Sequence, residues 1–167
     1  QNFIKKFEEL GINCVILPTS HAFHTSIVAP ANEPLKRFLE DLEINLPQIP
    51  ITSNYDGEFY PSKCEDGFTV KETILPQLTP QMSSPVEWTR QIENMYEEDT
   101  TIFVEVGPKR ALTTFCGQIL KDHEHVSIMT NHPKQGGIRS FLSSLGQLAI
   151  LGKKIVNPTL ENEIYSE

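Results

Sequence analysis

The sequence predicts an α/β protein with a mostly parallel sheet. Short apolar runs typical of strands alternate along the chain with stretches in which apolar residues recur at helical spacing. This alternation is the pattern of β–α–β units, in which helices cover parallel strands. With 167 residues the chain is also long enough for one domain with a substantial core.

The N-terminal part is predicted to be a short helix followed by a strand. Apolar residues recur at helical spacing over residues 2–10, and Gly11 follows as a C-terminal cap. Residues 13–17 are β-branched and apolar, which favours a strand covered on both faces. Asn32 is expected to cap the next helix, whose apolar stripe consists of Leu35, Phe38, Leu39 and Leu42.

The middle of the chain is predicted to be a short strand, a loop and a helix. The strand covers residues 51–53 and ends at a turn over 54–57. Residues 55–69 are mostly polar and contain two glycines and a proline, which indicates a surface loop. From Val70 to Leu78 the pattern is helical, although Pro76 removes a backbone donor.

The next helix is predicted to open with a capping box. Ser84 provides the cap, Pro85 the first turn, and Glu87 follows three residues after the serine. The apolar face of this helix is expected to lie in the core and not to form a cofactor site; it consists of Trp88, Ile92, Met95 and Tyr96.

Strands are predicted over residues 102–106 and 126–128, with helices over 111–120 and from Ile138 to Gly152. Gly107 and Pro108 form the turn after the first of these strands, with proline at the first helical position. The turn is followed by two cations, so an anion site at the helix N-terminus is the alternative.

Composition excludes several classes of protein. Lys and Arg number 14 against 22 Asp and Glu, a net charge of −8, which disfavours a nucleic-acid binder. The three cysteines are far apart and form no C-x-x-C pattern, so neither a disulfide framework nor a zinc site is indicated. No apolar run approaches a membrane span, and the N-terminus lacks the apolar core of a signal peptide. A soluble protein of the reducing cytoplasm is expected.

The motif His21-Ala22-Phe23-His24 follows the first predicted strand and is the principal candidate site. A metal site at His21 and His24 would need a third ligand, and the nearest downstream candidate, Glu33, lies across a predicted turn. His123 and His125 lie in a polar connection and are expected to be exposed. Two further blocks follow the motif, Gln81 to Trp88 and Phe103 to Pro108.

These three blocks, in this order and spacing, resemble the C-terminal half of an acyl-carrier-protein acyltransferase. The family comprises the malonyl-CoA:acyl-carrier-protein transacylases and the acyltransferase domains of polyketide synthases. The resemblance implies an α/β-hydrolase-like body (19–130), preceded by the last helix and strand of an inserted ferredoxin-like subdomain (1–18). A post-acyltransferase linker and terminal helix would follow (131–167).

The resemblance also implies roles for individual residues. His24 aligns with the histidine that deprotonates the nucleophilic serine and later the phosphopantetheine thiol, and Gln81 with the residue whose carbonyl orients it. The alternative for Gln81 is an ordinary loop residue. His21 aligns with a position lining the acyl pocket. His-Ala-Phe-His resembles the malonyl-selecting form of the motif, whereas Phe23 could instead pack in the core.

The family's serine lies in a G-x-S-x-G motif, and no such pentapeptide occurs in the chain. The chain is therefore expected to be a fragment that needs the missing N-terminal half, including the oxyanion donors and the carboxylate-binding arginine. No bound cofactor or metal is expected; the substrate would be a coenzyme A thioester. The expected partners are acyl carrier protein and neighbouring synthase domains, without nucleic acid or membrane. The alternatives are a non-catalytic docking or scaffold piece of a synthase and an unrelated small-molecule binder.

Overall fold

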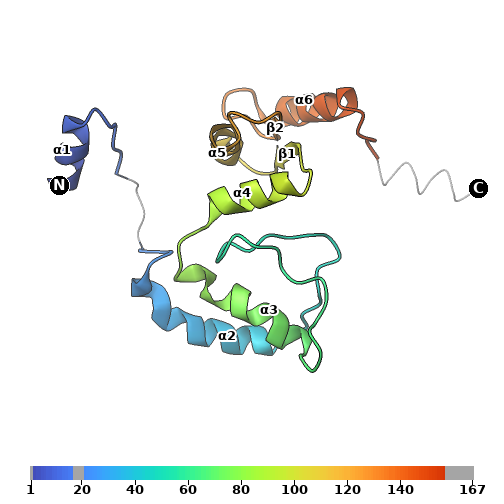
Figure 1. The fold of residues 1–167 in the computed structure, drawn as a ribbon. Helices are drawn as coiled ribbons and strands as arrows, with labels where there is room; N and C mark the ends of the chain where they lie inside the picture. The colour runs from blue at the N-terminus through green and yellow to red at the C-terminus, as the bar shows by residue number, and fades with distance from the viewer. Residues whose placement is uncertain (1, 17–20, 157–167) are drawn as a thin grey trace, which may run out of the picture. The chain divides into compact units, whose positions relative to one another are not determined.

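The structure is a computed structural model that describes residues 2–16 and 21–156 (Figure 1). The chain forms two compact units. Unit 1 contains Gln1–Gln48 and Pro61–Val86, and unit 2 contains Ile49–Tyr60 and Glu87–Glu167. The chain thus passes from one unit to the other three times. No helix among the described residues is long and apolar enough to cross a membrane.

Unit 1 is helical in its described residues. Its α-helices are α1 (Asn2–Glu9), α2 (Asn32–Glu40) and α3 (Val70–Leu78). Two 3-10 helices, η1 (Ser26–Ala31) and η2 (Thr79–Met82), contact each other, and both contact α2. The helices predicted over 2–10 and 70–78 are confirmed, and Gly11 adopts the left-handed φ of 74° expected of a C-terminal cap.

Two predictions in unit 1 are wrong. Residues 13–16 form no strand, and Leu17 lies outside the described residues. None of the described residues pairs with this stretch in a sheet, so its β propensity alone does not produce a strand. Asn32 does not cap α2 with its side chain, because η1 continues directly into α2. The backbone N–H of Asn32 donates to Ala29 O.

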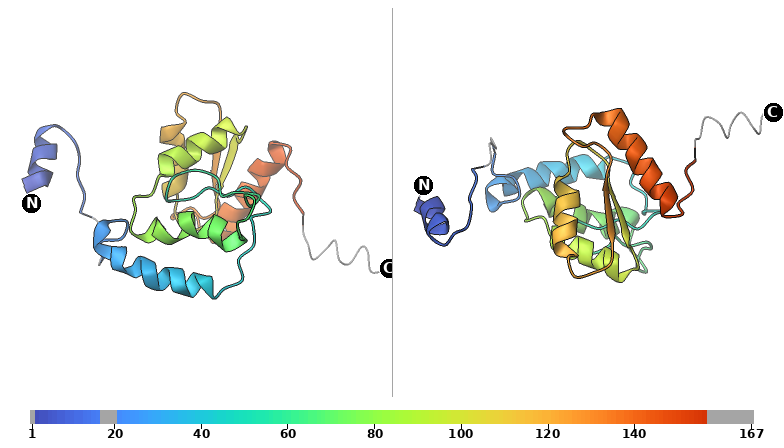
Figure 2. Two further views of the ribbon diagram at one scale, coloured as in Figure 1. Left: turned by 60° about the horizontal axis from the view of Figure 1, so that its bottom comes forward. Right: turned by 90° about the horizontal axis from the view of Figure 1, so that it is seen from above.

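Unit 2 contains a two-stranded parallel sheet. Strand β1 (Ile102–Glu105) pairs with β2 (Val126–Met129), with Ile102 opposite Val126. Helix α5 (Ala111–Ile119) contacts both strands and α6 (Gly137–Ile150) contacts β2. The two strands lie between α5 and α6 in Figures 1 and 2. Their parallel pairing confirms the predicted arrangement.

The core of unit 2 lies between α4 (Trp88–Glu97) and α5. Ile92, Cys116 and Leu120 are each only 2% exposed, and Trp88 and Tyr96 pack against them. The core role predicted for the apolar face of α4 is thus confirmed at these positions. Transfer of such side chains from water contributes roughly 25 cal/mol per Å² of apolar surface.

The predicted strand over 51–53 is reduced to a single antiparallel bridge between Thr52 and Phe59. The turn between them is held onto α4 by polar contacts. Thr52 Oγ1 donates to Gln91 Oε1 at 3.0 Å, and Gln91 Nε2 donates to Asn54 Oδ1 at 3.2 Å. Gln91 is only 3% exposed, so these bonds satisfy a buried amide.

The capping box predicted at Ser84 is wrong. Helix α4 begins at Trp88, and no side chain caps it. The N–H of Glu87 donates to Asn54 O at 3.0 Å and is therefore not given to the Ser84 hydroxyl. A capping box does form in the structure, at the start of α3, where Thr69 and Glu72 bond reciprocally.

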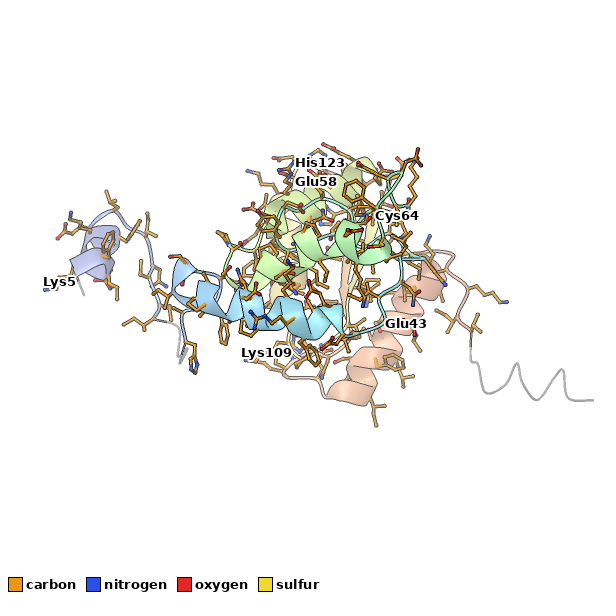
Figure 3. All side chains as sticks on the ribbon, turned by 90° about the horizontal axis from the view of Figure 1, so that it is seen from below. Lys5, Glu43, Glu58, Cys64, Lys109 and His123 are labelled. Carbon is orange, nitrogen blue, oxygen red and sulfur yellow. The ribbon has the colours of Figure 1, made fainter. Side chains whose placement is uncertain are left out.

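Pro108 does not occupy the first helical position, because α5 begins only at Ala111. The turn is instead shaped by an isolated bridge between Lys109 and Asn131, in which Lys109 N donates to Asn131 O at 3.0 Å. Lys109, labelled in Figure 3, has a φ of 73°, in the left-handed region that non-glycine residues rarely adopt.

Glu105, at the end of β1, binds the first turn of α5. Its carboxylate accepts from Thr113 Oγ1 at 2.6 Å, from Thr113 N at 2.8 Å and from Leu112 N at 3.3 Å. Partial burial acts to raise the pKa of Glu105, but the hydrogen bonds from Thr113 and the neighbouring backbone N–H groups outweigh it and lower the pKa. The N-terminus of α5, the alternative anion site, is thus already bound by a carboxylate of the chain itself.

Glu105→Gln is expected to lower the free energy of unfolding by about 1 kcal/mol near neutral pH, because the charge at the helix N-terminus is lost. A pKa lowered by folding means that the carboxylate stabilises the protein above its unfolded pKa of about 4.3. This stabilisation is lost as the pH falls through the folded-state pKa. Urea unfolding at neutral and acidic pH measures the difference, which should vanish in acid. Glu93→Gln, at an exposed position of α4, should change neither value.

Candidate functional site

The site lies in unit 1, where His24 meets the segment 81–84. The His24 ring nitrogen Nδ1 lies 3.0 Å from Gln81 O and 3.1 Å from Ser84 O. The backbone N–H of His24 donates to Met82 O at 2.8 Å. Two residues that sequence reasoning proposed, His24 and Gln81, are therefore brought together across 57 positions of the chain.

The hydrogen-bond partners determine which nitrogen of His24 carries the proton. Backbone carbonyl oxygens only accept hydrogen bonds, so Nδ1 must be the donor to Gln81 and Ser84. In the neutral ring the lone pair is then on Nε2. A histidine in this tautomer can accept a proton at Nε2 while its orientation is held through Nδ1.

His24 is also held in an unusual backbone conformation. Its φ is 60°, in the left-handed region, which costs a non-glycine residue about 1–3 kcal/mol. Next to it, Thr25 Oγ1 donates to Ala22 O at 2.7 Å and accepts from Ile27 N at 3.3 Å, which caps η1. Three hydrogen bonds from His24 and this cap maintain the strained conformation.

Two other residues of the motif, His21 and Phe23, are exposed. The rings of His21 and Phe23 have centroids 5.7 Å apart and planes tilted by 44°. Phe23 is 54% exposed, so it is not packed in a core of the described residues. No group of three or more potential metal ligands occurs within residues 2–16 and 21–156.

The remaining histidines of the predicted polar connection lie in unit 2. The ring of His123 packs against Tyr96, with centroids 4.9 Å apart, and the side chain is exposed. His125 Nδ1 lies 2.9 Å from His123 O and the residue is partly buried. In the described residues, neither ring forms a hydrogen bond with a segment far away in sequence, whereas the His24 ring bonds to Gln81 and Ser84.

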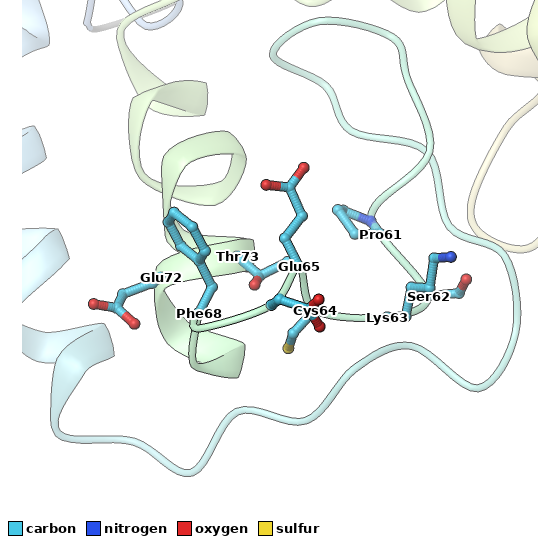
Figure 4. A pocket seen from close by; sticks show the side chains of 9 residues that line it. Pro61, Ser62, Lys63, Cys64, Glu65, Phe68, Glu72 and Thr73 are labelled. Atoms are coloured by element: carbon cyan, nitrogen blue, oxygen red, sulfur yellow. The ribbon is translucent and has the colours of Figure 1, made fainter.

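Unit 1 has a cavity of about 770 Å³ whose lining does not include His24, Gln81 or Ser84 (Figure 4). It is lined by the loop 61–68 and the start of α3, and its lining carries three carboxylates, of Glu65, Asp66 and Glu72, against one cation, Lys63. Such a lining repels anions at short range. The cavity therefore does not suit a ligand rich in phosphate or carboxylate groups.

Sequence reasoning missed three contributors to the site. Ser84 supplies a second carbonyl, Met82 fixes the backbone of His24, and Asn32 Nδ2 donates to Ser83 Oγ at 2.7 Å. The available signal was Ser84-Pro85, since a residue before proline favours an extended backbone. That signal was interpreted as a helix cap, whereas in the structure Ser84 lies in a bend after η2 and its carbonyl accepts from the His24 ring.

Comparisons with known proteins give consistent matches to one group. No family model matches the chain. The chain is 32% identical over 112 residues to the malonyl CoA-acyl carrier protein transacylase of Haemophilus influenzae, with 67% of the chain and 33% of that protein covered. It is 28% identical over 139 residues to the polyketide biosynthesis protein ThaF of Burkholderia thailandensis, covering 83% of the chain and 11% of that protein.

Solved structures give the same result. The malonyl CoA-acyl carrier protein transacylase of Clostridium perfringens superimposes with a TM-score of 0.67 at 29% identity. The match covers 89% of this chain and 43% of that chain. The chain therefore spans a third or less of the two curated relatives and less than half of this structure, and the shared α/β fold is that of part of a larger domain.

Proposed function

Because this chain belongs to the family of the malonyl-CoA:acyl-carrier-protein transacylases and polyketide synthase acyltransferase domains, we propose that it carries the general base of an acyltransferase. In this proposal the acyltransferase moves a malonyl unit from malonyl-CoA to an acyl carrier protein through a serine ester. The chain corresponds to 33% of the Haemophilus influenzae transacylase, and it contains no G-x-S-x-G motif. The serine would therefore be supplied by another part of the acyltransferase.

The observation that supports the proposal is the pair of hydrogen bonds from the His24 ring to two backbone carbonyls. Gln81 O and Ser84 O, at 3.0 and 3.1 Å, hold the proton on Nδ1 and direct the lone pair to Nε2. Carbonyl acceptors fix the tautomer as a carboxylate would, but they add no charge. Two carbonyl acceptors, the bond from the His24 N–H and the left-handed φ together support a role in which the orientation of the ring matters.

In the first half-reaction, His24 Nε2 takes the proton of the serine hydroxyl while the serine oxygen attacks the thioester carbonyl. The carbon–sulfur bond then breaks, and the imidazolium returns the proton to the leaving coenzyme A thiolate. In the second half-reaction, Nε2 takes the proton of the phosphopantetheine thiol, which attacks the serine ester. The serine oxygen leaves and recovers the proton, so the chain ends the cycle unchanged.

Phe23 and His21 are proposed to line the acyl site. Their rings lie 5.7 Å apart beside His24 in sequence, and both side chains are exposed. A phenyl ring at this place would occupy the volume that an α-methyl group requires, which supports malonyl as the acyl group. Overpacking of this kind disfavours a branched acyl group without excluding malonyl.

The proposal includes its partners and its compartment. The chain would act with the serine-bearing part of the acyltransferase, with acyl carrier protein and with neighbouring synthase domains, and it would bind no cofactor or metal. Cys14, Cys64 and Cys116 are free thiols, which supports a reducing compartment such as the cytoplasm.

Residues 1–167 alone are expected to form no acyl-enzyme from malonyl-CoA and to self-associate. Exposed apolar side chains in unit 2, among them Val106 at 85% and Leu142 at 61%, favour association, as does an open sheet edge. Mass spectrometry after incubation with malonyl-CoA and sedimentation measure both properties. An acyl adduct on a monomeric, cooperatively folded chain would contradict the proposal.

A further inference from the structure

Asn32, the first residue of α2, forms a hydrogen bond with the segment 81–84, which holds the His24 ring. Its amide Nδ2 donates to Ser83 Oγ at 2.7 Å. Ser83 lies between Gln81 and Ser84, whose carbonyls accept from the His24 ring. Resting on the proposed function, we infer that Asn32 is a positioning residue for the general base: it holds the two carbonyls in place through Ser83.

The direction of each hydrogen bond follows from the groups involved. Ser83 has one hydroxyl proton, and Ser83 Oγ lies 3.2 Å from Pro80 O, which can only accept. The Ser83 proton therefore goes to Pro80, and the bond from Asn32 must come from the amide nitrogen. The relay thus runs in one direction, from α2 through Ser83 to the carbonyl of Pro80 in η2.

This relay connects the elements on either side of the site. Asn32 belongs to the helical stretch that begins at Ser26, directly after His24 and its neighbouring cap Thr25. Pro80 belongs to η2, which also contains Gln81 and is followed by Ser84, the two residues whose carbonyls accept from the His24 ring. Movement of η2 against α2 would change both distances to Nδ1 at once, and misplacement by about 1 Å can cost 10²-fold in rate.

The energetics favour a positioning role over a purely stabilising one. Asn32 Oδ1 is buried and has no hydrogen-bond partner among the described residues. A buried amide that is only half satisfied contributes little net stability, because the unpaired oxygen has lost its hydration. Replacing Asn32 with an apolar residue of similar volume should therefore change the position of the two carbonyls more than it changes the stability of the fold.

The test uses an acyltransferase that contains this chain together with its serine-bearing part. Asn32→Leu removes the donor at similar volume, and Asn32→Asp keeps the shape but can only accept. Ser83→Ala breaks the relay at its centre, whereas Ser83→Thr retains the hydroxyl and is the matched control. Malonyl loading gives kcat and KM, and two-bond 1H–15N NMR of the His24 ring reports which nitrogen is protonated.

Asn32→Leu and Ser83→Ala are each expected to lower kcat about 5- to 50-fold with KM for malonyl-CoA unchanged. The NMR spectrum should show His24 partly protonated on Nε2 in place of Nδ1. The double variant should be no slower than the slower single variant, because both substitutions interrupt the same relay. Ser83→Thr should retain the wild-type rate and spectrum.

Several results would overturn the inference. These are a wild-type kcat in folded Asn32→Leu, a reduced kcat without any change in the His24 spectrum, and a Ser83→Thr variant as slow as Ser83→Ala. If Asn32→Leu does not fold, Asn32→Asp and Ser83→Ala decide the question by the same measurements. A wild-type rate in His24→Ala would reject the proposed function itself, so the two failures are distinguishable.

Discussion

His24→Ala is expected to slow malonyl loading by about 10²–10⁴-fold in an acyltransferase that contains this chain, because a positioned general base is typically worth that factor. The loss should appear in kcat, since alanine removes the proton acceptor of the chemical step. Single-turnover loading from malonyl-CoA, followed by mass spectrometry of the acyl-enzyme, measures the effect directly.

The matched control is His125→Ala. His125 also has Nδ1 within hydrogen-bond distance of a backbone carbonyl, that of His123 at 2.9 Å, but its acceptor is a neighbour in sequence. Its replacement should leave loading unchanged. Equal rates for His24→Ala and the wild-type protein, or equal losses in both variants, would remove His24 from the role of base.

Phe23→Ser is expected to relax the choice between malonyl and methylmalonyl units. Filling the space of an α-methyl group costs about 1–3 kcal/mol, which corresponds to roughly 5- to 150-fold in relative kcat/KM. The smaller side chain removes the clash but provides no new contact, so the variant should accept the branched unit without strongly preferring it. Competition between malonyl-CoA and methylmalonyl-CoA measures the ratio.

Phe38→Ser is the control for the loss of an exposed phenyl ring. Phe38 lies on α2 and is 61% exposed, close to the 54% of Phe23, but it does not belong to the histidine motif. Its replacement should leave the ratio of the two units unchanged. An unchanged ratio in folded Phe23→Ser would favour a packing role for Phe23 and argue against selection by ring volume.

Local sequence patterns predicted the elements whose capping and apolar residues lie within the element or next to it. Helix α3 matched its predicted range, 70–78, because its capping residues and periodicity lie within a dozen positions. The parallel strands β1 and β2 were also predictable, since each is a short apolar run flanked by helical stretches. Residues 13–16 failed because a strand needs a neighbour, and the sequence of one stretch does not identify one.

The site was predictable only as far as the motif extended. His24 and Gln81 were found through the resemblance, whereas the roles of Ser84 and Asn32 depend on contacts 60 and 51 positions apart. Both residues are of the type that caps helices, and the local interpretation assigned them to helix starts. In the structure neither side chain caps a helix: Ser84 contributes its backbone carbonyl to the His24 ring, and the Asn32 amide donates to Ser83.

The three passages of the chain between the units limit how the protein can be divided. A cut at residue 86 would separate most of unit 1 from most of unit 2, but the segment Ile49–Tyr60 would leave with the wrong piece. Gln91 would then lose its bonds to Thr52 and Asn54, and the buried amide would have to be rehydrated. The two units are thus interleaved in sequence order, so no single proteolytic cut separates one unit from the other.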